Sequence, residues 1–209
     1  MTEAEWISCT DPQKMLEFLR GKAGERKARL FAVACCRGLW HRMAGPLRRV
    51  VEVGERYADG LASPDEADRE AGLAIGQGGE GYRFSMAAWN TVALCSEPDD
   101  PFHIASDTAA QANAVQHGQS AQCRLLRCIF GPLPFRSASL SPAVLTWRGG
   151  LLVSMARRIY DSRDFTDMPV LADALEEAGC RDADVLGHCR SDGEHVRGCW
   201  AIDLLLGKS

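Results

Sequence analysis

The fold is decided by the stretch ERKARLFAVACCRGLWHRM, residues 25–43. It is rich in alanine, leucine and arginine, three residues that favour helices. Its centre, residues 30–36, is the longest apolar run in the chain and is apolar on nearly every side of a helix. A helix without a polar face is buried all round, so this stretch predicts a helix through the middle of the fold.

Helix signals continue on both sides of that stretch. Asp11-Pro12 and Ser63-Pro64 each place a capping residue before a proline, which is typical of a helix start. Further helical patterns cover residues 13–20, 47–61, 82–95, 102–130, 141–161, 169–178, 182–189 and 195–206. No alternating apolar and polar run reaches the length of a strand. We therefore expect an all-α protein of about eight or nine helices that forms a single compact domain over residues 1–209.

The composition is that of a soluble globular protein. Of the 209 residues, 46% are hydrophobic and 25% are charged, which excludes disordered and collagen-like classes. No apolar run approaches the roughly 18 residues that span a bilayer. The first five residues, MTEAE, are acidic in net charge and lack the apolar core of a signal peptide. These features predict a cytoplasmic protein that does not contact a membrane.

The net charge of −4 conceals two oppositely charged stretches. Residues 20–56 hold ten basic side chains against three acidic ones, and residues 161–194 hold ten acidic side chains against three arginines. The two stretches can face each other, or they can direct binding to a protein partner or to a second copy of the chain. Nucleic-acid binding is disfavoured, because the sequence pI of about 5.8 lacks a basic footprint.

Nine cysteines are present, an odd number without the regular spacing of a disulfide scaffold. Free cysteine packs like a small apolar residue, so most of them are expected in the core. Cys35-Cys36 in the central helix fits this expectation.

Four donor side chains lie within twelve residues near the end of the sequence: His188, Cys189, His195 and Cys199. If the chain is helical from His195 onward, then His195, Cys199 and Asp203 share one helix face. Imidazole nitrogens and thiolates are the ligands of structural zinc sites, so we consider these four residues as metal ligands and zinc as the possible metal.

Other interpretations of this segment stay open. Cys180 or Cys35 can complete a ligand set in place of one of the four. The histidines can instead bond to carbonyls or carboxylates while the cysteines pack in the core. A third possibility is a nucleophilic pair of Cys199 and His195, which needs a lowered thiol pKa and an oxyanion pocket.

Two further patterns have a structural interpretation. His103 and Asp107 are spaced as a hydrogen-bonded pair on one helix face, and His117 lies too far along that helix to share a metal with His103. The glycines of residues 76–81 form an expected loop, because the Lys-Ser/Thr ending of a phosphate loop is absent.

Several phrases resemble a family of paralogous proteins from planctomycete bacteria. They are MTEAEW with CTDP in residues 1–12, MLEFLRGK in 15–22, RLFAVACCR in 29–37, ADALEEAGC in 172–180, and HVRGCW with DLLLGK in 195–208. The resemblance implies a bacterial, intracellular, stand-alone or modular unit, and it supplies no catalytic residues.

No catalytic signature appears in the sequence. Together with the charge segregation, this predicts a helical protein-interaction or regulatory module without catalytic activity. The alternative is a zinc-stabilised domain built on the histidines and cysteines of residues 188–199, and a thiol-dependent enzyme is the third hypothesis.

Overall fold

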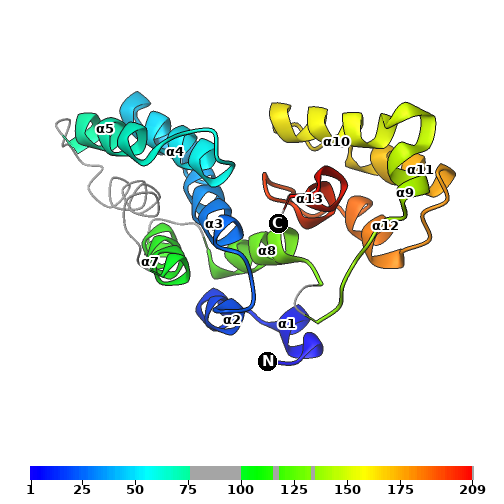
Figure 1. The fold of residues 1–209 in the computed structure, drawn as a ribbon. Helices are drawn as coiled ribbons and strands as arrows, with labels where there is room; N and C mark the ends of the chain where they lie inside the picture. The colour runs from blue at the N-terminus through cyan, green and yellow to red at the C-terminus, as the bar shows by residue number, and fades with distance from the viewer. Residues whose placement is uncertain (76–99, 115–117, 133–134, 209) are drawn as a thin grey trace. The chain divides into compact units, whose positions relative to one another are not determined.

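The computed structural model describes residues 1–75, 100–114, 118–132 and 135–208, and all regular secondary structure in these residues is helical (Figure 1). The all-α prediction is confirmed. Contacts divide the chain into two compact units, residues 1–126 and residues 127–209, and each unit is described by itself. The single domain predicted over residues 1–209 stays a prediction.

The described residues form twelve α-helices, more than the eight or nine predicted. Their bounds are α1 Glu3–Ser8, α2 Pro12–Leu19, α3 Glu25–Arg37, α4 Gly45–Ala58, α5 Pro64–Ile75, α7 Pro101–Ala114, α8 Gln119–Phe130, α9 Pro142–Thr146, α10 Leu151–Ser162, α11 Met168–Glu177, α12 Ala183–Cys189 and α13 Trp200–Leu206. The count is higher because residues 102–130 form two helices instead of one, and residues 141–161 are interrupted by a 3₁₀ turn, Trp147–Gly149. The short helix α1 was not predicted.

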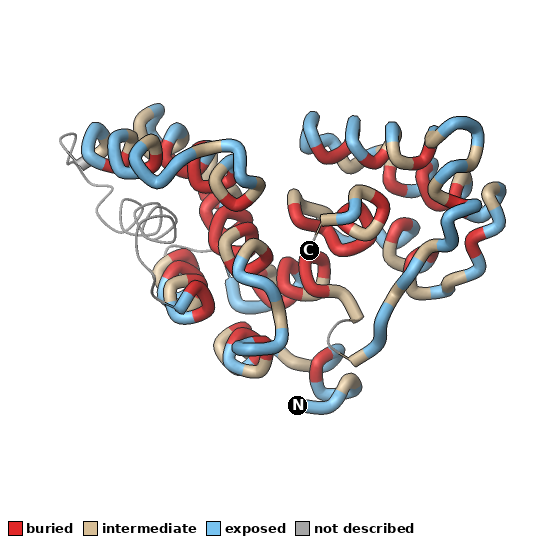
Figure 2. Tube along the Cα trace, in the orientation of Figure 1, coloured by how far each residue is buried: buried red, intermediate tan, exposed pale blue. Residues whose placement is uncertain are grey.

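Helix α3 is the centre of the first unit, as predicted. Residues 30–36 are all buried, and the helix packs against both α7 and α4. Figure 2 shows the buried colour along most of α3. The predicted helix over residues 25–43 ends early, at Arg37, because the following glycine closes it and a 3₁₀ turn, Trp40–Arg42, continues the chain.

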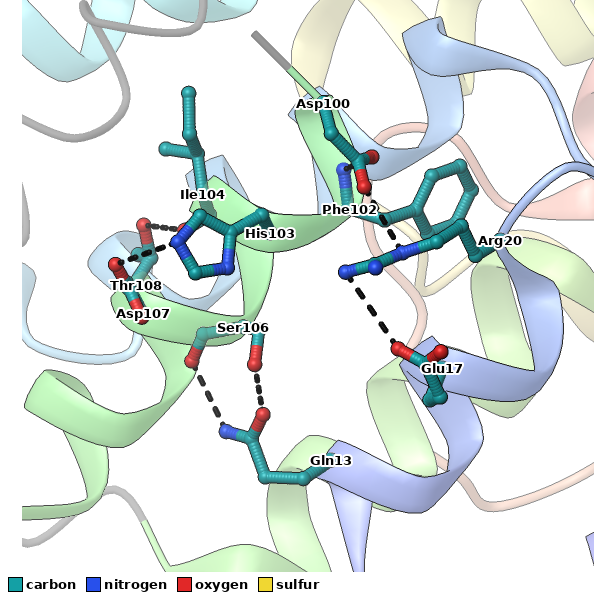
Figure 3. A network of polar contacts seen from close by, with 10 residues as sticks. All are labelled: Gln13, Glu17, Arg20, Asp100, Phe102, His103, Ile104, Ser106, Asp107 and Thr108. Carbon is teal, nitrogen blue, oxygen red and sulfur yellow. Dashed lines mark hydrogen bonds and ion pairs between the residues drawn. The ribbon is translucent and has the colours of Figure 1, made fainter.

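Polar side chains join α2 to α7 in the first unit (Figure 3). The amide of Gln13 donates to the carbonyl of Ser106 at 3.0 Å, and the Ser106 hydroxyl donates back to the Gln13 amide oxygen. Arg20 pairs with Asp100 at 2.9 Å. These contacts fix α2 beside the start of α7.

The sequence signals for helix starts are confirmed in this unit. Asp11 caps α2 by accepting bonds from the backbone of Gln13 and Lys14. Ser63 likewise accepts a bond from the backbone of Glu66 at the start of α5. The predicted pair of His103 and Asp107 on α7 is present, with a separation of 3.8 Å.

Many arginines of the basic stretch pair with acids of the same unit. The pairs are Arg26–Asp59, Arg29–Glu25, Arg37–Glu55, Arg49–Glu70 and Arg56–Glu66. Much of the positive charge is therefore balanced within residues 1–126. That the basic and acidic stretches face each other, or bind a partner, stays a prediction.

The second unit encloses its own core beneath α10, α11, α12 and α13. A kink at Gly149-Gly150 separates α9 from α10, and Arg148, directly before the two glycines, has a positive φ of 47°. Ser141 caps α9 by accepting a bond from the backbone of Val144.

Gly131, directly after α8, has φ +61° and lies against the indole of Trp200. A Cβ at this position would lie 2.4 Å from the Trp200 Cγ. Only glycine allows the end of α8 to approach α13 so closely, and this approach places the last turn of α8 beside the segment between α12 and α13.

Several predictions fall on residues outside those described: the loop at 76–81, the helix at 82–95, and His117. Within the described residues, none of the helices combines the length and the apolar character that crossing a membrane requires.

Candidate metal centre

Four donor side chains of the second unit gather at one point: Cys128, His188, His195 and Cys199. One ligand atom from each residue lies within 4.8 Å of the ligand atoms of the other three. In an ideal tetrahedral zinc site the Zn–S and Zn–N bond lengths place sulfur and nitrogen ligands about 3.6 Å apart. The four atoms therefore already stand near the corners that a tetrahedral ion needs.

The individual distances agree with that geometry. The Nε2 atom of His188 lies 3.2 Å from the Sγ atom of Cys199. The Nδ1 atom of His195 lies 3.9 Å from the same sulfur and 4.0 Å from the Sγ atom of Cys128. A small contraction brings all four donors to bonding distance of a common centre.

Three elements and one connecting segment supply the ligands. Cys128 lies in the last turn of α8, His188 in the last turn of α12, and Cys199 is the residue that precedes the first turn of α13. His195 lies in the segment between α12 and α13. The chain thus contributes ligands from positions far apart in sequence, which is common for structural metal sites built into a fold.

Local bonds shape the connecting segment. Ser191 donates its hydroxyl to the carbonyl of His188 at 2.8 Å, which ends α12 in a turn. A second turn, closed by the bond from Cys199 N to Val196 O at 2.9 Å, contains Gly198 with φ +91°. Together these turns return the chain so that His195 and Cys199 both meet His188.

Aromatic rings hold the histidines in place. The ring of His188 lies 5.2 Å from that of Trp200 and 4.8 Å, edge-on, from that of His195. The ring of Phe165 stacks on His195 at 6.3 Å. Rigid packing of this kind orients ligands before a metal binds and so reduces the entropy lost on binding.

The cluster combines buried sulfur with partly exposed imidazole. Cys128 and Cys199 are buried, while His188 and His195 are of intermediate exposure. The Nε2 atom of His195 is buried and has no hydrogen-bond partner among the described residues. The other ring nitrogen, Nδ1, is the one that faces the two sulfurs.

The surroundings favour a thiolate at Cys199. Burial by itself raises the pKa of this thiol, but hydrogen bonds with Cys128, His188 and His195 and the charge of His188 lower it by more. The pKa of Cys199 therefore lies well below its ordinary value. Because metals bind the thiolate, this shift reduces the cost of losing the proton on binding.

The structure brings together three of the four residues considered as ligands from the sequence, His188, His195 and Cys199. Cys189 is not part of the cluster. It follows His188 on α12, and neighbouring helix residues point about 100° apart, so when His188 faces the cluster Cys189 faces the core. Burial raises the pKa of the Cys189 thiol, as expected for a packed cysteine.

The predicted helix over residues 195–206 is wrong in its first turn, because α13 begins only at Trp200. His195, Cys199 and Asp203 therefore do not share a helix face. The turn at Gly198, not a helical repeat, brings His195 to Cys199.

Cys128 is the candidate ligand that the sequence did not reveal. It lies 67 positions before His195, in a helix whose pattern indicates a core residue. No local spacing connects it with residues 188–199. Gly131, three positions after Cys128, lies close to Trp200 and so marks the contact between α8 and α13. This contact can be seen only in the folded structure.

The two other candidate ligands take no part in the cluster. Cys180 is buried in the core of the second unit just after α11, and Cys35 is buried in α3 of the first unit. Cys35 and Cys36 are core residues, as predicted.

No protein-family model, curated protein or solved structure matches the chain. The resemblance to a planctomycete family stays a prediction, and the geometry of the cluster is the basis for a function.

Proposed function

We propose that residues 127–209 form a zinc-stabilised helical unit, in which Cys128, His188, His195 and Cys199 hold one Zn²⁺. The observation that carries this proposal is the convergence of two thiols and two imidazoles within 4.8 Å from separate segments of the chain. A set of two cysteines and two histidines is a common ligand set of structural zinc sites.

The role is structural because the protein supplies all four ligands. Catalytic zinc sites keep one position open for water or substrate, whereas structural sites are closed by four side chains. The zinc would join the last turn of α8 to α12, α13 and the segment between them. Its binding free energy would then add directly to the stability of the second unit.

The wider role predicted from the sequence, a protein-interaction or regulatory module without catalytic activity, stays a prediction. A zinc-stabilised unit is consistent with such a role, since it supplies a rigid scaffold and no reacting group.

The test is elemental analysis by mass spectrometry on tag-free protein that has been purified without added metal. We expect about one zinc per chain for a closed four-ligand site. A metal-free protein that also fails to bind zinc on titration would overturn the proposal, and so would stoichiometric binding of a different metal.

A matched pair of variants locates the site. Cys128→Ala and Cys189→Ala each remove one buried thiol from the same unit. Only Cys128 belongs to the cluster. We expect Cys128→Ala to lose zinc and Cys189→Ala to retain it, whereas equal zinc content in both variants would contradict the assignment.

A further inference from the structure

The two cysteines of the cluster come from different segments and have their sulfurs within 4.8 Å of each other. Cys128 ends α8 and Cys199 precedes α13. A disulfide requires a Sγ–Sγ distance of about 2 Å and correctly spaced Cβ atoms. The two sulfurs have to approach each other by at most about 3 Å to form this bond, so they are a candidate pair for a disulfide as well as for a metal.

We propose that the centre is also a site of oxidation, where a hydroperoxide converts Cys128 and Cys199 to a disulfide and releases the zinc. This inference rests on the zinc site proposed above. The proposed modification is the disulfide, and it regulates metal binding: the reduced protein holds the zinc and the oxidised protein releases it.

The chemistry balances with hydrogen peroxide as the oxidant. The Cys199 sulfur attacks one peroxide oxygen, the O–O bond breaks, and a sulfenic acid and a hydroxide ion form. The Cys128 sulfur then attacks the sulfenic sulfur, the S–S bond forms, and a second hydroxide leaves. Two protons from solvent convert the hydroxides to two waters. The two sulfurs together lose two electrons, the peroxide gains them, and the zinc leaves as Zn²⁺ because two histidines alone do not hold it.

The arrangement of the cluster supports a reaction at these sulfurs. The two histidines are partly exposed and the two cysteines are buried, and the ligand atoms of all four lie within 4.8 Å of one another. A peroxide, which is little larger than water, therefore has only a short distance to travel from the exposed imidazoles to Cys199.

The oxidised unit keeps its fold because the disulfide joins the same two segments as the metal. Zinc connects the end of α8 to the start of α13 through its ligands, and the Cys128–Cys199 bond connects them directly. The two states are therefore alternative cross-links at one place. Reduction and added zinc are expected to restore the first state.

The test treats zinc-loaded wild-type protein with a few equivalents of hydrogen peroxide and follows zinc release with a colorimetric chelator. We expect one zinc released per disulfide formed and an intact mass lower by two hydrogen atoms. We also expect a cross-linked peptide pair containing Cys128 and Cys199 after proteolysis without reduction. Dithiothreitol and zinc should restore both the mass and the metal content.

Cys189→Ala is the matched control, since it removes a neighbouring buried thiol outside the cluster and should release zinc as the wild type does. The inference is overturned if zinc stays bound, if Cys199 links to Cys180 or Cys189, or if the cysteines are oxidised to sulfinic or sulfonic acids without a link. Zinc content before peroxide separates the two proposals. If the purified protein neither contains nor binds zinc, the zinc site itself is contradicted. If zinc-loaded protein forms no Cys128–Cys199 bond, only the oxidation proposal is contradicted.

Discussion

The two units bury polar groups in different ways. In residues 1–126 the buried acids have basic partners from the same unit: Glu55 is paired with Arg37 at 2.8 Å and Asp59 with Arg26 at 3.0 Å. In residues 127–209 two buried thiols and two partly exposed imidazoles face one another. The ion pairs of the first unit are formed by side chains alone, whereas the zinc proposed for the second unit would bind between its four donor side chains. The stability of residues 127–209 would then depend on the supply of zinc, and that of residues 1–126 would not.

Removal of zinc should produce the largest difference in stability between the two units. With free zinc about a thousand times above its Kd, binding contributes about 4 kcal/mol to the folded state. Dialysis against a chelator should therefore lower hydrogen-exchange protection across residues 127–209 and leave the protection of α3 unchanged. Equal loss of protection in both units, or none in either, would contradict the comparison.

Loss of a buried carboxylate should affect the other unit. The Glu55 side chain is 1% exposed and accepts a bond from Arg37, so Glu55→Ala leaves a largely buried guanidinium without this partner. We expect a loss of about 3 kcal/mol in the free energy of unfolding of residues 1–126, measured by urea denaturation, with zinc content unchanged.

Glu52→Ala is the matched control for that variant, because Glu52 is an exposed glutamate one turn earlier on α4. Its effect should stay within about 0.5 kcal/mol. Similar losses for the two variants would show that the burial of Glu55 is not the cause.

Gly131→Ala tests how the metal centre is supported by packing. The added Cβ meets the Trp200 indole at 2.4 Å and the residue retains φ +61°, so strain and overlap together should cost about 3 kcal/mol. Because the Trp200 ring also packs on His188, zinc affinity in a chelator competition should fall by about tenfold or more.

Gly179→Ala separates the two causes in the same unit. Gly179 also has a positive φ, +94°, but nothing lies within 4 Å of the position of its Cβ. This variant should lose about 1 kcal/mol from strain alone and keep its zinc affinity. If it weakens zinc binding as much as Gly131→Ala does, the contact with Trp200 is not the cause.

The smallest expected effect lies at Arg148, the non-glycine residue with φ 47° between α9 and α10. Arg148→Gly and Arg148→Ala both remove the exposed pair with Glu177 and the contact with the Trp147 ring. Only glycine relieves the backbone strain. We expect the glycine variant to be more stable than the alanine variant by about 1 kcal/mol in thermal unfolding, and the reverse order would contradict it.

Local signals in the sequence predicted the helices well where one or two residues determine a helix start. Asp11 and Ser63, each followed by a proline, both cap helices as their positions indicated. The apolar run of residues 30–36 likewise predicted the buried helix α3. These features depend on contacts between residues that are neighbours in the sequence, so they can be predicted from the sequence alone.

The candidate site was predictable only in part for the same reason. His188, His195 and Cys199 lie within twelve positions, so their proximity follows from a short turn of any kind. Cys128 is brought to them by the packing of the whole second unit, and no short-range pattern encodes that contact. The predicted helix from residue 195 is also interrupted at Gly198, whose positive φ is incompatible with a helix. Helix α13 therefore begins only at Trp200.

The separation of 67 positions between Cys128 and His195 also concerns the rates of folding and unfolding. A contact so distant along the chain forms late, after the intervening helices have docked. An ion that binds only the finished site stabilises the native state more than the transition state for folding, so it acts on the unfolding rate. We therefore expect zinc to lengthen the lifetime of the folded second unit and to leave the speed of its formation almost unchanged.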